Sequence, residues 1–339
     1  MNRVLVLGGT GYIGARLVAR LAAAGMQPLA ASSRGGPGVL RLDTRDETAL
    51  SQALGQCDAV VNCVAGSGPA IALGAQVLAR ALAASECRRL VHFSTMSVYG
   101  AQEGLLDEQA TLNAGLGWYG RAKIDAEAQF ARLPEASVTV LRPGCVFGPG
   151  SELWVGRIAR WLEAGRLGDL GPGGDGWSNL VHVDDVCQAA VLALQAPPHP
   201  DQLRTYNLAA PDSPRWNDYF ADLALAIGAT PLRRVRSRQL QLDAFVAGPP
   251  LHIGRKLLAR VRRDAQLLPP PITPGLLGLW QRHLRLDARA ATRELALPWT
   301  PYAKAVQQCA RWWIDRTQEQ ARPWNPPAQA RAARPDGNA

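Results

Sequence analysis

The chain opens with a short apolar run that leads directly into a cluster of glycines. Residues 3–7 read RVLVL, and GGTGYIG follows at 8–14, ahead of a helical pattern. A glycine turn between a strand and a helix lets the backbone approach a phosphate group, which meets the free N–H groups of the helix N-terminus. Among the features of this sequence, this one most limits the fold, because it predicts a β–α unit with a phosphate-containing ligand at its turn.

The first 150 residues alternate apolar runs with helical patterns. We expect strands at 3–7, 28–32, 38–42, 58–64, 89–95 and 137–142, and helices at 12–24, 46–54, 70–85 and 119–133. Such alternation predicts an α/β fold with a Rossmann-type, doubly wound parallel sheet and helices on both faces.

The regular alternation of strand and helix patterns ends after residue 150. We expect short strands at 179–184 and 203–208 and helices at 153–165, 185–195, 216–227, 253–263, 287–295 and 302–318. We therefore predict a dinucleotide-binding domain over 1–150, to which 179–210 returns. The remaining parts, 151–178 and 211–319, form a smaller, discontinuous C-terminal substrate lobe, and 320–339 is expected to be a poorly ordered tail.

The charge of the chain does not indicate a nucleic-acid partner. The formal net charge is +9, but the arginines are scattered and no recognised nucleic-acid module is present. The apolar runs are shorter than the roughly 20 residues that a transmembrane segment needs. No charged segment followed by an apolar one resembles a secretory signal, so we expect a cytoplasmic protein.

Six cysteines are present at positions 57, 63, 87, 145, 187 and 309. No two of them form a C-x-x-C pair, which favours buried free thiols in a reducing compartment. No His, Cys, Asp and Glu residues show the spacing of metal ligands, so we expect no metal site.

Three of the glycines in the opening turn have separate expected roles. Gly8 permits the tight turn, Gly11 lets the backbone approach a pyrophosphate, and Gly14 lets the helix pack closely against the strand. The ribose of the dinucleotide should meet the end of the second strand, which reads AASSR at 30–34. No acid stands there to bind a 2′-hydroxyl, whereas Ser33 and Arg34 suit a 2′-phosphate, so NADP(H) is favoured over NAD(H).

Asp43 follows the third predicted strand. Its carboxylate is placed to contact the adenine edge, or alternatively to cap the next helix.

A tyrosine and a lysine lie at positions i and i+4 of a predicted helix. Tyr119 and Lys123 should share one helix face, where the ammonium would lower the pKa of the phenol and make it a useful acid or base. Almost all basic residues of the chain are arginines; only three lysines occur, and one of them is at this position. Thr95, at the end of the fifth strand, would hold the same substrate oxygen, with Ser94 and Ser97 as alternative hydroxyls.

Several motifs occur together in a characteristic order. GGTGYIG, STMSVYG (94–100), YGRAK (119–123), LRPGCVFGPG (141–150) and NLVHVDDV (179–186) resemble the extended short-chain dehydrogenase/reductase family, which includes the NAD-dependent epimerase/dehydratase group. The resemblance is close over about residues 1–210 and weaker through DARAATRELALPWTP (287–301).

The resemblance implies roles for individual residues. It implies catalytic roles for Thr95, Tyr119 and Lys123, with Lys123 also binding the ribose. It implies cofactor contacts for Gly8, Gly11, Tyr12, Ile13, Gly14, Val64, Ala65, Pro143 and Val146. In this family the helices at 70–85 and 119–133 commonly form a dimer face, so a homodimer is the candidate assembly.

One departure from the family pattern bears on the reaction. Family dehydratases carry an Asp-Glu pair after the Ser/Thr, whereas this chain has Met96 and Ser97. The first hypothesis is therefore an NAD(P)-dependent oxidoreductase that moves a hydride between nicotinamide and a carbonyl or secondary alcohol of a small-molecule substrate, with Tyr119 as general acid/base. A nucleotide-sugar epimerase that retains NAD and a non-catalytic dinucleotide sensor are the alternatives.

Other residues have structural interpretations that we prefer. Asp184 is expected to cap the helix that starts near 185, and His182 to form local hydrogen bonds. Trp118 and Trp177 are candidates to line a substrate pocket, alongside ordinary packing roles. The segment 240–285 is a candidate lid, and the basic stretch 252–263 within it reads as a surface helix.

Overall fold

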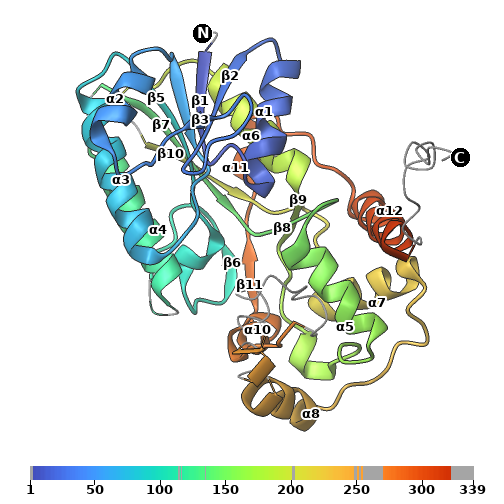
Figure 1. Ribbon diagram of the computed structural model, residues 1–339. Helices are drawn as coiled ribbons and strands as arrows, with labels where there is room; N and C mark the ends of the chain where they lie inside the picture. Colours follow the sequence, from blue (N-terminus) through green and yellow to red (C-terminus); the bar gives the residue numbers. More distant parts are fainter. Residues whose placement is uncertain are drawn as a thin grey trace, which may run out of the picture.

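The computed structural model describes residues 3–113, 115, 117–133, 135–200, 203–247, 250–251, 253–254 and 270–321. Its central element is a seven-stranded, wholly parallel sheet with the strand order β10-β7-β5-β4-β1-β2-β3 (Figure 1). The strands are β1 (Arg3–Leu7), β2 (Gln27–Ser32), β3 (Leu40–Arg41), β4 (Ala59–Asn62), β5 (Arg89–Phe93), β7 (Ser137–Pro143) and β10 (Leu203–Leu208). The prediction of a Rossmann-type doubly wound sheet is confirmed.

Helices cover both faces of this sheet, as Figure 1 shows. One face carries α1 (Tyr12–Ala23), α6 (Val183–Gln195) and α11 (Arg289–Glu294), and the other carries α2 (Glu47–Leu54), α3 (Gly68–Ala83) and α4 (Trp118–Phe130). Each face buries its own apolar core, one built around Val4, Val61 and Leu194 and the other around Leu5, Val60 and Leu78. Strands buried on both faces explain why the sequence shows continuous apolar runs here instead of alternation.

A third apolar core lies away from the sheet, among the helices in the lower part of Figure 1. It is formed by α5 (Arg157–Glu163), α7 (Trp216–Ile227), α10 (Pro274–Trp280) and α12 (Tyr302–Ala321), together with the short α8 (Ser237–Leu242). Trp161, Trp216 and Trp280 are fully buried in it. Tryptophan-rich packing gives this small lobe the apolar burial that its size would otherwise limit. The chain division into a dinucleotide domain and a substrate lobe remains our proposal.

Two small parallel ribbons join the sheet to the lobe. They pair β6 (Gly104–Leu106) with β11 (Leu284–Leu286), and β8 (Cys145–Phe147) with β9 (Leu180–His182). The strands β6, β8 and β11 were not predicted, because three-residue strands give too short a pattern to be distinguished from loops.

Several predicted boundaries differ from the structure. The predicted strand 89–95 ends at Phe93, and a 3₁₀ turn, Met96–Tyr99, follows it. The expectation that Asp184 caps α6 was wrong: the cap is His182, whose Nδ1 accepts from the backbone N–H of Asp184. The Asp184 carboxylate instead pairs with Arg16 of α1 at 3.1 Å, which ties the two helices together.

The remaining expectations concern the C-terminal half. The helix α12 extends to Ala321, and the rest of the predicted tail lies outside the described residues, as does most of the basic stretch 252–263. The six cysteines are free thiols. None of the helices within the described ranges is long and apolar enough to cross a membrane.

Candidate active site

A cavity of about 520 Å³ lies over the glycine turn between β1 and α1. Its walls come from the turn itself, from the ends of β2 and β3, and from the segment after β4. It is lined by Leu7, Gly8, Thr10, Gly11, Tyr12, Ile13, Gly14, Ala31, Ser32, Ser33, Arg34, Leu42, Asp43, Thr44, Arg45, Cys63, Val64, Ala65 and Ala70. The structure thus brings ten of the predicted cofactor-binding residues to one cavity, while Lys123, Pro143 and Val146 are not among its lining residues.

The glycines of the turn are required by close approaches. Gly8 has φ of 78°, a left-handed conformation that favours glycine. A Cβ at Gly14 would lie 2.2 Å from the carbonyl oxygen of Gly8, so any other residue would push α1 away from the turn. No side chain caps the N-terminus of α1, and no acidic residue lies in its first turn. This end of the helix therefore presents its dipole to an anion, which fits the pyrophosphate of a dinucleotide.

Two arginines stand at the far end of the cavity, where the second and third strands end. Arg34 is exposed, and Arg45 pairs with Asp43 at 2.6 Å. Hydrogen bonds from Arg45 hold the pKa of the Asp43 carboxyl down at about 2. The N-cap of α2 is Asp46, so Asp43 does not cap this helix. Sequence reasoning missed Arg45, although its place two residues after Asp43 was a usable signal.

Thr95 lies at the turn that ends β5. Its hydroxyl accepts from the backbone N–H of Ser97 at 3.2 Å and so caps the 3₁₀ turn. Of the alternative hydroxyls, Ser94 donates to the buried carboxylate of Glu127, and Ser97 lies 3.3 Å from Thr95 Oγ1. The Ser94 hydroxyl is therefore engaged in a structural contact with Glu127, whereas the hydroxyls of the buried Thr95 and the partly buried Ser97 are bonded to each other within the turn.

Tyr119 lies in the first turn of α4, close to the Thr95 turn. The approach of the two elements depends on Gly120, where a Cβ would lie only 2.5 Å from the carbonyl oxygen of Ser97. Trp118 covers the start of α3 and contacts the Tyr119 ring edge-on, with ring centroids 5.7 Å apart. Gly120 within YGRAK was a sequence signal for this close packing that the motif analysis did not use.

Lys123 is buried one turn further along α4 and is 2% exposed. Its Nζ donates to the carbonyl oxygens of Phe93, at 2.7 Å, and Val64, at 3.2 Å. These contacts fix the ammonium between the ends of β4 and β5, and Val64 itself lines the dinucleotide cavity. Burial lowers the pKa of Lys123 to about 8.

The expectation that Lys123 lowers the pKa of Tyr119 is not met by the protein alone. Burial raises the pKa of Tyr119, and the ammonium lies 6.0 Å from the centroid of its ring. The reason is that Lys123 is directed to two backbone carbonyls and not to the phenol. In this state Tyr119 holds its proton at neutral pH and is suited to donate it as a general acid.

A buried ionic network anchors α4 to the sheet. Glu127, one turn after Lys123, forms a bidentate pair with Arg142 of β7, with the shortest contact at 2.6 Å. Arg142 also donates to the hydroxyl of Tyr99, which donates in turn to Asn207 of β10. The network joins the helix that carries Tyr119 and Lys123 to three strands or turns, and the sequence analysis did not identify it.

One cation of the lobe, Arg157, is partly buried and forms no ion pair among the described residues. The Nε and Nη2 atoms of Arg157 on α5 are buried and have no hydrogen-bond partner among the described residues. The guanidinium packs against the rings of Trp154 and Trp161, 5.6 and 5.0 Å from their centroids. Burial lowers the pKa of Arg157 to about 10, while the thiol of Cys145, at the start of β8, opposes this shift.

His182 and the two acids that follow it do not form a catalytic group. Asp185 accepts from the backbone and hydroxyl of Thr300, and Asp184 pairs with Arg16. No cluster of His, Cys, Asp or Glu able to hold a metal ion occurs in the described part of the chain.

The fold and this cavity define a dinucleotide-binding protein of the Rossmann class. The sequence profile described as the NAD dependent epimerase/dehydratase family matches residues 4–209, and the chain belongs to that family.

Curated relatives include protein YeeZ of Escherichia coli K12, 32% identical over 145 residues, which are 42% of this chain and 47% of that protein. The chain thus spans about half the length of this relative. A 3-diazoavenalumate denitrifying reductase of Streptomyces is 28% identical over 88% of this chain and 96% of its own length. A 2-alkyl-3-oxoalkanoate reductase of Stenotrophomonas maltophilia is 30% identical over 57% of this chain and 66% of its own.

Solved structures share the fold. The dTDP-glucose 4,6-dehydratase DesIV of Streptomyces venezuelae, with NAD bound, has a TM-score of 0.70 at 20% identity and covers 94% of this chain and 98% of its own. The human epimerase family protein SDR39U1, with NADPH, has a TM-score of 0.68 at 20% identity, with coverages of 91% and 99%. Relatives of this fold therefore hold either NAD or NADPH.

Proposed function

We propose that this chain is an NAD(P)-dependent reductase or dehydrogenase that acts on a carbonyl or secondary alcohol of a small molecule. The observation that carries the proposal is the position of Lys123, which links the segment lining the dinucleotide cavity to the end of β5, two residues before Thr95. The reductases among the curated relatives support it. The test is net consumption of NADPH or NADH with a carbonyl panel, since an epimerase that retains NAD would show no net turnover.

In the proposed reaction a nicotinamide cofactor, when bound, would supply or accept a hydride. The chain's own groups handle the oxygen of the substrate. The hydroxyl of Thr95 donates a hydrogen bond to the carbonyl oxygen and orients it, and Tyr119 donates its proton to that oxygen as negative charge develops there. The phenolate that remains takes up a proton from solvent, and the buried Lys123 holds the ends of β4 and β5 together beside it. In the reverse direction Tyr119 accepts the proton of the alcohol.

We further propose that NADP(H) is preferred over NAD(H). Arg34 and Arg45 both line the end of the cavity where the 2′-position of the ribose is expected, and no carboxylate at the end of β2 competes for a 2′-hydroxyl. The carboxylate of Asp43 is already paired with Arg45. A 2′-phosphate would meet the planar donor groups of Arg34.

Arg34→Ala should weaken NADPH binding by about 10- to 100-fold, because a charged hydrogen-bonded contact is lost. NADH, which lacks the 2′-phosphate, serves as the internal control, and its affinity should change less than about twofold. Fluorescence titration of both cofactors measures this. If the affinities for NADPH and NADH fall equally, Arg34 does not contact the 2′-phosphate.

We propose that the substrate carries an anionic group, and that Arg157 binds it. An uncompensated buried cation is costly, and a bound anion would remove that cost. The lobe around Arg157 is otherwise aromatic: the Trp154 ring is tilted against that of Trp216, and the Trp161 ring contacts that of Trp280 edge-on. Oxoalkanoates and avenalumates, named for two relatives, are carboxylates, which agrees with this proposal.

Arg157→Met should lower kcat/KM for a 3-oxoalkanoate by about 10- to 100-fold and leave its methyl ester unaffected. The free energy of unfolding should stay the same or rise, because the substitution removes an unpartnered buried charge. Steady-state kinetics with the acid and ester, together with urea unfolding, measure both effects. A loss of stability with equal losses for acid and ester would assign Arg157 to the lobe's packing instead.

We also propose a homodimer through the outer faces of α3 and α4. Leu73 on α3 and Trp118 on α4 are large apolar side chains that remain 45% and 61% exposed. Burial of both side chains against a second copy would stabilise the dimer, because apolar area would be removed from water.

A cytoplasmic location remains a prediction from the sequence.

A further inference from the structure

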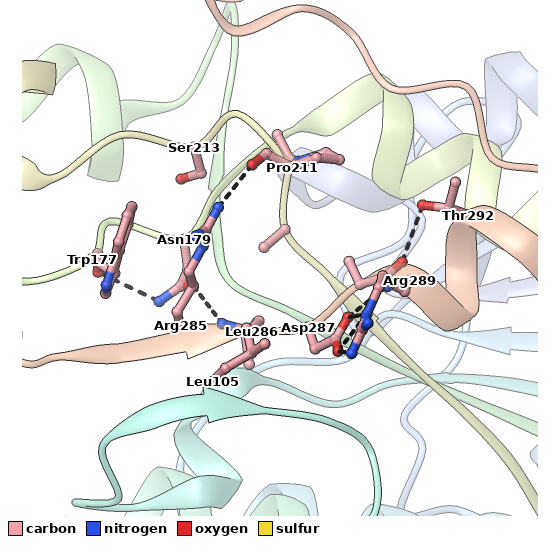
Figure 2. Close-up of a pocket in the computed structure, with 13 residues that line it drawn as sticks. Leu105, Trp177, Asn179, Pro211, Ser213, Arg285, Leu286, Asp287, Arg289 and Thr292 are labelled. Atoms are coloured by element: carbon pink, nitrogen blue, oxygen red, sulfur yellow. Dashed lines mark hydrogen bonds and ion pairs between the residues drawn. The ribbon is translucent and has the colours of Figure 1, made fainter.

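A second cavity, of about 300 Å³, lies beside the β6–β11 ribbon (Figure 2). Neither the residues of the glycine turn nor Thr95, Tyr119 or Lys123 line it. It is lined by Leu105, Trp177, Asn179, Ala209, Ala210, Pro211, Ser213, Arg285, Leu286, Asp287, Ala288, Arg289 and Thr292. Its volume is at the lower end of the range of small-molecule sites.

The base of this cavity is held rigidly. Asn179, which is 3% exposed, donates to the carbonyl oxygen of Leu284 and accepts from the N–H of Leu286. Ser213 accepts from the N–H of Leu180, and its hydroxyl lies 3.0 Å from that of Ser178. Because these side chains are fixed by buried hydrogen bonds, the base of the cavity is preorganised.

The cavity is lined by positive charge that is only partly compensated. Figure 2 shows Arg285 extending beside the Trp177 ring to Pro211, while Asp287 and Arg289 pair with each other at one side of the cavity. The Arg285 guanidinium lies 4.3 Å from the centroid of the Trp177 ring and donates to the Pro211 carbonyl at 3.1 Å. It forms no ion pair with a carboxylate in the described ranges. Arg215 stacks on the same ring at 4.6 Å.

The contacts of Arg285 and Arg289 leave some of their guanidinium N–H groups free to bind an anion. Stacking on Trp177 orients the plane of the Arg285 guanidinium, and the Pro211 carbonyl takes one of its five N–H groups. The Asp287 carboxylate is taken up by Arg289, whose side chain is otherwise 76% exposed. Among the lining residues, one carboxylate, that of Asp287, faces two guanidinium groups, those of Arg285 and Arg289, so the lining has an excess of one positive charge, which favours an anionic ligand.

We propose that this cavity is a binding site for a small phosphate monoester, separate from the dinucleotide cavity. The phosphoryl oxygens accept from Arg285 and from the free N–H groups of Arg289, since a planar guanidinium matches phosphate geometry. The ester group lies against Leu105, Ala210 and Leu286, which form the apolar part of the lining. This proposal does not rest on the proposed reaction.

The test is calorimetric titration of phenyl phosphate into the full chain saturated with NADPH, which fills the dinucleotide cavity. We expect one site, and Arg285→Ala should weaken it by about 10- to 100-fold. Arg285→Lys keeps the positive charge but loses the planar set of guanidinium donors, so its affinity for phenyl phosphate should also fall. Arg132→Ala, which removes an equally charged exposed arginine after α4, should bind as the parent chain does.

Three outcomes would overturn the proposal. Absence of binding at millimolar phenyl phosphate would exclude the site. Binding that disappears when NADPH is present would place the phosphate in the dinucleotide cavity. If the Arg285→Ala variant binds phenyl phosphate as tightly as the parent chain while it retains NADPH binding, which shows that it is folded, the cavity is not a phosphate-binding site.

Discussion

Tyr119→Phe is expected to lower kcat by about 10²- to 10⁴-fold while the affinity for the cofactor stays within about twofold of the parent value. The substitution removes one oxygen from a half-buried ring that keeps its contact with Trp118, so α4 should stay in place. The loss arises because no other group in the described site is placed to protonate the substrate oxygen. Single-turnover kinetics separate this chemical step from product release.

The matched control removes a tyrosine hydroxyl elsewhere. Tyr302→Phe deletes an oxygen that donates to Asp222 at 2.9 Å, on α12 of the lobe. It should leave kcat within about twofold, since one exposed hydrogen bond contributes only about 0.5–1.5 kcal/mol to stability and none to the reaction. If the Tyr119→Phe variant is as active as this control, Tyr119 is not the general acid/base. If the variant loses turnover but keeps its full biological function, the chain is a dinucleotide sensor and not an enzyme.

Local sequence was enough to predict the sheet and the dinucleotide cavity. The glycine turn and the ends of the first four strands lie close together because parallel strands present their carboxyl ends on one edge, so each short motif could be placed independently. Arg34 was found in this way and Val64 through the family resemblance, and the structure brings both to the cavity. Arg45 was missed because a side chain's role there depends on its pairing with Asp43.

The contacts that the sequence analysis missed join residues far apart in the chain. Asn179 bonds to β11 more than 100 residues later, and Glu127 bonds to Arg142 on a different element. Such pairs leave no periodic signal, since a polar residue in a buried element looks the same whether or not it has a partner. The direction of the Tyr119 pKa shift was mispredicted for the same reason, because the carbonyls that hold Lys123 belong to Val64 and Phe93.

Glu127→Gln is expected to lower the free energy of unfolding by about 3–5 kcal/mol. The side chains of Glu127 and Arg142 are 3% and 5% exposed, and their shortest contact is 2.6 Å. The neutral amide leaves the Arg142 guanidinium buried without a counter-charge, and it also weakens the contact that Ser94 makes beside Thr95. Guanidinium unfolding followed by circular dichroism measures the change.

An exposed pair provides the comparison that assigns this cost to burial. Arg80 and Glu47 lie at 2.8 Å, but their side chains are 50% and 49% exposed, so Glu47→Gln should cost only about 0–1 kcal/mol. The double variant Glu127→Met/Arg142→Met should recover much of the loss, because it removes both buried charges and not one. If Glu127→Gln and Glu47→Gln cost the same, the network would not be what holds α4, and the position of Tyr119 and Lys123 would have to depend on the apolar packing of α3 and α4 instead.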